Sequence, residues 1–483
     1  MSVARSPELT ACPACYRPVR RDGARCGHCF ADLRKLQELA PEDAKNRLRA
    51  GRVRAEESTR SDRSRRRLIR AAQHLVMLLL VVGLFYPQMP WVDSNLPAPL
   101  SRSAGVQPGS GSWPIAGGDV GGSRVTAAAV ALGAETAWAR DFTSGIAVPV
   151  VASESLLFVA LDDGRLLAIA AADGRDVWSR QLPFALRWAA PTIAGDRLYI
   201  ATRDGHVQAL EAATGELIWD TSLGVAYPSV PVVADGVVYT YYGLDRPDRS
   251  YRAPLFGLDA EDGSVLWRQD LDTVYPLVTP VVDERYVAVA AADRLRIFDR
   301  ISGAETYWYP FSVRAMPNSL ALADGAIYAM SSRRLVAVDI DTRTPWHYSI
   351  RGAWLQIWAW GLAPRPPAPQ TLWVTGDVPR EAYAPVVLPD QLIVGGLDGD
   401  VRAYSRDSGA TLWSREVGPL SGQPLQTAGG LLILQDGALV LLDSSDGSEL
   451  ARHEYPAGGV LSAIVTDHGT YVAGAGGALS ALR

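Results

Sequence analysis

The sequence predicts an all-β protein, an eight-bladed β-propeller, preceded by a small zinc ribbon and one transmembrane helix. Three observations lead to this prediction. A repeat of roughly 41 residues, marked by tryptophan, proline and glycine, runs through the large C-terminal part of the chain. Four cysteines stand in two C-x-x-C pairs near the N-terminus. One strongly apolar stretch separates these two regions.

The cysteines predict a structural zinc site in a zinc ribbon at residues 1–34. The pairs read CPAC and CGHC, in the spacing C-x2-C-x10-C-x2-C. Four thiolates can close a tetrahedral Zn²⁺ site without an open position, so the metal would serve folding rather than catalysis. Two redox C-x-x-C pairs are the alternative, although no βαβ pattern surrounds either one. The pattern resembles short zinc ribbons at the N-termini of many prokaryotic membrane proteins. The predicted ligands are Cys12, Cys15, Cys26 and Cys29.

Charge is distributed unevenly along the chain. Residues 1–74 carry 18 Lys and Arg against 9 Asp and Glu, and the remainder carries 29 against 43, a net charge of −14. Within the first part, residues 35–70 are predicted to form a basic, charged helical segment. An acidic C-terminal part gives no reason to expect nucleic-acid binding there.

Residues 71–92 are predicted to form a transmembrane anchor. As a helix they would span roughly 33 Å, against a hydrocarbon core of about 30 Å. Arginines precede the stretch, and Tyr86 and Trp91 lie at its far end as interfacial aromatics. The positive-inside rule then places the N-terminus in the cytoplasm. A cleaved signal peptide is the alternative, but a structured module precedes the stretch and no clear cleavage site follows it.

Residues 93–134 are predicted to be a Pro-, Gly- and Ser-rich linker and lead-in, and residues 135–483 the propeller. A typical repeat, residues 188–219, contains an apolar strand with proline, an Asp-Gly turn, a third strand, a second glycine turn and tryptophan. Four short strands joined by tight turns at this period are typical of a propeller blade. The predicted first strands are residues 145–152, 188–194, 227–233, 275–282, 317–323, 383–388, 421–427 and 459–465.

The last repeat stops after three strands, and the missing fourth strand is found at the other end of the repeat region. Residues 135–142, ETAWARDF, precede the first complete repeat. We expect this strand to complete the C-terminal blade, because closing the ring removes open sheet edges that invite aggregation.

The repeats resemble the PQQ-binding-like propeller family, which includes the outer-membrane-assembly lipoprotein and the quinoprotein alcohol dehydrogenases. The segment SWPIAGGDVGGSR at residues 112–124 is similar to the start of many members. The resemblance implies the fold, which hosts both enzymes and scaffolds. A quinoprotein would need PQQ, a metal held by acidic and amide ligands, and typically a vicinal disulfide. The propeller contains no cysteine, and Asn318 is its one asparagine, so PQQ is not expected.

Two insertions are the expected sites of recognition, because long loops on a rigid scaffold commonly carry it. Residues 241–254 interrupt blade three between its second and third strands. Residues 351–380 are interpreted as the connection between blades five and six, which would place both insertions on one face. The second is rich in tryptophan and forms either a partner-binding surface or a lid over the central channel. The predicted partner-binding residues are Tyr241, Tyr242, Tyr251, Trp354, Trp358, Trp360 and Trp373.

These features predict a non-enzymatic, single-pass protein of a prokaryotic cytoplasmic membrane, with the propeller outside the cytoplasm. No hydrolase motif such as G-x-S-x-G or H-E-x-x-H is present. The expected function is a protein-binding or assembly scaffold with partners in the cell envelope. A degenerate quinoprotein dehydrogenase and a carbohydrate-binding receptor are the alternatives.

Overall fold

The computed structural model divides the chain into two compact units, Met1–Leu96 and Pro97–Arg483. The fold is described for the following residues: 9–12, 15, 17–20, 23–34, 73, 112–130, 132, 135–224, 227–243, 252–272, 278–291, 294–311, 317–343, 350–364, 371–455, 460–474 and 476–483.

The first unit contains a small antiparallel hairpin. Strand β1 (Leu9–Ala11) pairs with β2 (Pro18–Arg20), and a second pairing joins Arg25 to Asp32. The basic segment at residues 35–70 lies outside the described residues, as does the predicted anchor at residues 71–92 apart from Gln73. Among the described residues, no helix has the length and apolar character needed to cross a bilayer.

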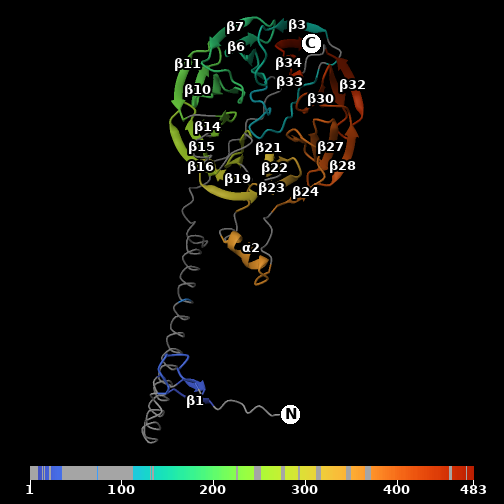
Figure 1. Cartoon of the computed structure of the whole chain (residues 1–483). Helices are drawn as coiled ribbons and strands as arrows, with labels where there is room; N and C mark the ends of the chain where they lie inside the picture. The colour runs from blue at the N-terminus through green and yellow to red at the C-terminus, as the bar shows by residue number, and fades with distance from the viewer. Residues whose placement is uncertain are drawn as a thin grey trace. The chain divides into compact units, whose positions relative to one another are not determined.

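The second unit is an eight-bladed propeller, as predicted (Figure 1). Each blade is a sheet of short antiparallel strands in meander order. Blade one contains β4 (Val151–Ala152), β5 (Leu156–Ala160), β6 (Arg165–Ala170) and β7 (Asp176–Gln181), and blade two contains β8 (Thr192–Ala194), β9 (Arg197–Ala201), β10 (His206–Glu211) and β11 (Leu217–Ser222). Blade three contains β12 (Tyr227–Pro228), β13 (Val232–Ala234), β14 (Val237–Gly243), β15 (Arg252–Asp259) and β16 (Val265–Asp272). Blade four contains β17 (Val281–Val282), β18 (Tyr286–Ala291), β19 (Arg294–Asp299) and β20 (Glu305–Pro310).

Blades five to eight follow the same plan. Blade five contains β21 (Pro317–Ala323), β22 (Ala326–Ser331), β23 (Leu335–Asp339) and β24 (Trp373–Thr375), and blade six contains β25 (Val386–Val387), β26 (Gln391–Gly395), β27 (Asp400–Ser405) and β28 (Thr411–Glu416). Blade seven contains β29 (Leu425–Thr427), β30 (Gly430–Gln435), β31 (Ala438–Leu442) and β32 (Glu449–Glu454). Blade eight contains β33 (Val460–Thr466), β34 (Gly469–Gly474), β35 (Ala478–Leu482) and β3 (Thr136–Asp141).

Burial decreases from the middle of each blade to its outer edge. The second strands are buried on both faces, as in β22, where all six residues are buried, and some third strands, such as β10, alternate between buried and half-buried residues. The fourth strands alternate between exposed and half-buried residues, as in β7. Adjacent blades pack face to face, so the second strands read as largely apolar runs and the outer strands do not.

The ring closes as the sequence predicts. Strand β3 pairs antiparallel with β35, with Ala139 opposite Ser480 and Asp141 opposite Ala478. The N-terminal strand therefore supplies the fourth strand of the C-terminal blade, and no blade lacks an outer strand in the described part of the propeller.

The lead-in at residues 113–128 is more than a linker, because it crosses the central channel (Figure 1). We call it the channel-crossing segment. Its backbone is hydrogen-bonded to the first strand of six blades, beginning with a two-way bridge between Trp113 and Ala152 in blade one. Further bonds join it to Ile193, Val282, Leu322, Val387 and Gln426.

The two insertions leave opposite faces of the ring, which corrects the predicted common face. In blade three, β14 and β15 flank residues 244–251, so this insertion joins the second and third strands as predicted. In blade five the long insertion joins β23 to β24, the third and fourth strands, instead of linking two blades. It begins beside the tight turn at Gly325, whose carbonyl accepts the N–H of Ile340. In a meander, the connection between the second and third strands and the connection between the third and fourth strands lie on opposite faces, so the two insertions cannot share a face.

Candidate functional site

The four cysteines converge in the first unit. Their Sγ atoms all lie within 4.8 Å of one another, with Cys12 and Cys29 3.7 Å apart and Cys15 and Cys26 3.5 Å apart. A tetrahedron with Zn–S bonds near 2.3 Å places its sulfurs about 3.8 Å apart, so the observed spacing fits one ion.

Local backbone geometry holds the thiols in this arrangement. The N–H of Cys12 donates to the carbonyl of Arg17, and that of Cys26 to the carbonyl of Ala31. The N–H of His28 points at Sγ of Cys26, at 3.5 Å, which offsets part of a thiolate charge. The His28 ring lies against Arg17 instead, with Nδ1 3.3 Å from the guanidinium. These residues can therefore hold a structural metal through sulfur alone.

Helix α2 (Arg351–Ala359) is the most exposed apolar element described in the second unit, and Figure 1 shows it on the connection between β23 and β24. None of its residues is buried. Trp358 is 42% exposed and Trp360, just beyond the helix, is 65% exposed. The Trp354 indole is tied down by a 2.9 Å hydrogen bond to the carbonyl of Pro364. A helix without buried residues does not form a packed lid.

The remaining predicted partner-binding residues do not join this surface. Tyr241 and Tyr242 are fully buried in the core, and burial raises the pKa of both. Their hydroxyls donate to the carbonyls of Val278 and His206, so their prediction as surface contacts is wrong. Tyr251 lies outside the described residues.

Trp373 is also a structural residue. It begins β24, is only 8% exposed, and donates its indole N–H to the carbonyl of Arg406 in the next blade. In the other blades the tryptophan usually follows the second glycine turn by four residues, and the long insertion before Trp373 hides this spacing.

Two cavities border the channel-crossing segment, of about 280 and 250 Å³. Such cavities are where a propeller of this kind could hold a quinone and a metal ion. The first cavity has no carboxylate in its wall. The one carboxylate of the second, Asp119, already accepts hydrogen bonds from the backbone and hydroxyl of Ser123. A hard divalent ion needs several oxygen ligands, so these cavities do not fit a quinone–metal pair.

Comparisons with known proteins agree with the architecture. The crystal structure of BamB from Moraxella catarrhalis is 19% identical, with a TM-score of 0.56, covering 72% of this chain and 97% of that one. The quinohemoprotein alcohol dehydrogenase from Comamonas testosteroni is 14% identical, with a TM-score of 0.58, covering 77% and 80%. Likenesses at this level of identity show the fold. A search of curated protein sequences finds no match.

A family profile decides the relationship. The profile described as outer membrane protein assembly factor BamB matches residues 121–246, 228–356 and 397–483. The matches begin inside the channel-crossing segment and run to the last residue of the chain. By its repeats, its ring of eight blades and this match, the chain belongs to the BamB family of propellers.

Proposed function

We propose that this protein is a membrane-anchored scaffold whose propeller presents α2 to a protein partner in the cell envelope. In this proposal residues 71–92 cross a prokaryotic cytoplasmic membrane once, with the zinc ribbon in the cytoplasm and the propeller outside. Membership of the family of the outer membrane protein assembly factor BamB supports a role in binding envelope proteins.

The observation that carries the proposal is the exposure of α2. A nine-residue helix is marginal in water on its own. This one has no side-chain N-cap, no acid in its first turn and no base in its last turn. Its apolar side chains Leu355 and Trp358 are spaced three residues apart and both exposed. Covering them with a partner would remove apolar area from water and stabilise the helix.

The test compares partner capture by the full-length protein and by a Trp358→Ser/Trp360→Ser variant, in detergent-solubilised envelopes and by quantitative mass spectrometry. We expect recovery of a specific envelope protein to fall at least about tenfold, because exposed tryptophans are common binding hot spots. The matched control is Leu412→Ser/Leu450→Ser, which removes two side chains that are 54% and 53% exposed on outer strands.

Equal recovery by the two variants contradicts the proposal. If α2 binds a membrane surface instead of a protein, the tryptophan variant would lose that binding as well. Flotation with protein-free anionic vesicles distinguishes the two cases, because only lipid binding is then measured. Protease added to intact cells with a permeabilised outer envelope tests the orientation: digestion of the cysteine-bearing end instead of the propeller would contradict it.

The enzyme alternative has its own assay. PQQ with Ca²⁺ added to the purified protein should produce neither a thermal shift nor dye-linked alcohol oxidation, because the channel cavities supply too few oxygen ligands. Dye-linked alcohol oxidation in the presence of PQQ and Ca²⁺ would contradict the scaffold proposal and identify the protein as a dehydrogenase.

A further inference from the structure

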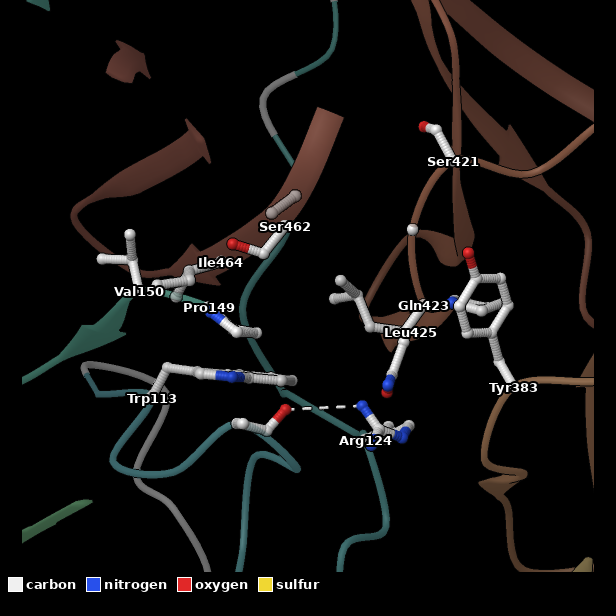
Figure 2. Close-up of a pocket in the computed structure, with 14 residues that line it drawn as sticks. Trp113, Arg124, Pro149, Val150, Tyr383, Ser421, Gln423, Leu425, Ser462 and Ile464 are labelled. Carbon is white, nitrogen blue, oxygen red and sulfur yellow. Dashed lines mark hydrogen bonds between the residues drawn. The ribbon is translucent and has the colours of Figure 1, made fainter. Parts of the chain in front are cut away.

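The larger cavity, of about 280 Å³, lies between the channel-crossing segment and the residues at or just before the first strands of blades one, six, seven and eight. Figure 2 shows the side chains around it. They combine one guanidinium, three hydroxyl groups, one amide and an apolar wall. The wall includes Trp113, Arg124, Tyr383, Ser421, Gln423 and Ser462.

Three buried polar atoms in this wall have no hydrogen-bond partner: Nε of Arg124 and the hydroxyl oxygens of Ser421 and Ser462. In the described part of the chain, the one other buried side-chain atom of this kind is the hydroxyl of Ser319, which is not in the wall. Native proteins leave few buried polar groups unpaired. Their concentration at one cavity indicates a polar ligand.

The charge of Arg124 favours an anion. Among the described residues, it has no carboxylate within ion-pair distance, and the acid that acts on it most, Asp119, is bonded to Ser123. Burial lowers the pKa of Arg124 to about 10, so the side chain remains cationic at neutral pH. A half-buried cation without a carboxylate partner is costly, and an anion in the cavity would offset that cost.

The backbone holds Arg124 in place. Its φ of 60° lies in the left-handed region, which a side chain other than glycine rarely adopts and which persists only where the surroundings impose it. Here the Arg124 carbonyl accepts the N–H of Gln426, and its N–H donates to Gly117. The guanidinium also donates to the carbonyl of Ala116 at 3.4 Å. It is therefore positioned before any ligand arrives.

We propose that this cavity binds a small organic acid with a second polar group. Its carboxylate pairs with Arg124, since a guanidinium can donate two parallel hydrogen bonds to a carboxylate. Its other polar end meets the hydroxyls of Ser421 and Ser462, which Figure 2 shows on the side of the cavity away from Arg124. The indole of Trp113, only 3% exposed, forms an apolar wall for the middle of the ligand. This site is independent of the partner surface on α2.

The test measures thermal stability and binding heat for the full-length protein in detergent with succinate, malate and the uncharged analogue succinamide. At about 10 mM ligand, we expect an acid to raise the melting temperature by about 2–5 °C and succinamide to leave it unchanged. Arg124→Gln should weaken acid binding about 10- to 100-fold, and Ser462→Ala about 2- to 10-fold. Ser319→Ala, which removes an equally buried and unpaired hydroxyl elsewhere, should leave affinity unchanged.

A second readout shows that loss of binding is not loss of folding. Without ligand, Arg124→Gln and Ser462→Ala should melt at or above the temperature of the unmodified protein, because the first removes a charge that burial penalises and the second an unpaired buried hydroxyl. The proposal is overturned if no acid produces a shift. It is also overturned if sulfate and succinamide stabilise the protein as well as the acids do, or if the acid effect persists in Arg124→Gln.

Discussion

At the scale of single residues, six tryptophans join consecutive blades through the same contact. Each indole N–H donates to a carbonyl in the turn between the third and fourth strands of the next blade, and each ring covers a glycine there. Trp178, for example, donates to Ala212 at 2.9 Å and lies over Gly215. The tryptophan and glycine of the repeat are thus two halves of one contact. The six are Trp138, Trp178, Trp219, Trp267, Trp373 and Trp413.

Replacing Gly215 tests this contact. Its φ is 74°, and a Cβ there would lie 2.8 Å from the Trp178 ring. Gly215→Ala should destabilise the protein by about 1–2 kcal/mol through its left-handed backbone and by a further 1–3 kcal/mol or so through overpacking. Gly195→Ala is the control, because φ is 61° and nothing lies within 4 Å of its Cβ position. Equal losses of melting temperature in the two variants would contradict the contact.

At the scale of elements, the channel-crossing segment depends on close backbone packing, whereas the cysteine hairpin depends on a bound metal. The segment follows the first strands so closely that Gly121 is buried, with its carbonyl accepting the N–H of Leu322. The hairpin β1–β2 has a minimal core made largely of cysteine, with Val19 and Leu33 beside it. A core of that size does not support folding without a metal.

The close approach of Gly121 predicts a large effect from one methyl group. A Cβ on Gly121 would clash with the backbone carbonyl of Leu322, which cannot rotate away. Gly121→Ala should cost about 1–3 kcal/mol and loosen the segment, which would appear as a red shift of Trp113 fluorescence. Gly476→Ala, whose Cβ would meet nothing within 4 Å, should leave both properties unchanged. A normal melting temperature for Gly121→Ala would show that the segment is not held as described.

The hairpin predicts one zinc ion per chain. Cys26→Ser should abolish bound zinc, measured by elemental analysis, because each thiolate supplies one of four ligands. His28→Ala is the control, since its ring lies against Arg17 and away from the thiols. Because the cysteines belong to a separate compact unit, a chelator should leave the propeller's melting temperature unchanged. Loss of zinc in His28→Ala, or retention in Cys26→Ser, would contradict a four-cysteine site.

At the scale of the whole molecule, the ring depends on a strand taken from the start of the repeat region. Strand β3 closes blade eight, and Trp138 on this strand donates to Ala171 in blade one at 3.0 Å. The contact therefore joins the two ends of the propeller. The equivalent contact of Trp178 joins two blades that are already consecutive in the chain.

This difference predicts that replacing Trp138 and replacing Trp178 by alanine have different consequences for the ring. Trp138→Ala and Trp178→Ala remove half-buried indoles, so each should cost somewhat less than the ~3–5 kcal/mol of a fully buried tryptophan. Only Trp138→Ala should release β3, because no turn joins β3 to its pairing partner β35, whereas β7 is joined directly to β6. Limited proteolysis should then cut near residue 142 in Trp138→Ala and spare that site in Trp178→Ala. Identical cleavage patterns would contradict the closure.

Local signals were sufficient for the blades because each one repeats the same turn chemistry. The first strands and the closing strand lie where the repeat predicts them, and the insertion in blade three is shorter than predicted, since residues 241–243 and 252–254 belong to β14 and β15. The partner surface was only partly predictable. Trp358 and Trp360 are exposed, whereas Tyr241, Tyr242 and Trp373 are buried. Aromatic side chains have the same sequence signature whether they are exposed or fill a core, and only packing distinguishes them.

By itself, the sequence determined the all-β repeat architecture, the number of blades, the closing strand and the clustering of the cysteines, since all of these follow from spacing along the chain. Only the tertiary structure decided which face each insertion leaves, that residues 113–128 cross the channel, and that Arg124, Ser421 and Ser462 line one cavity. The physical reason is that Arg124 lies about 300 positions or more before Ser421 and Ser462 in the chain, and no periodic pattern links a lead-in peptide to the strands it contacts.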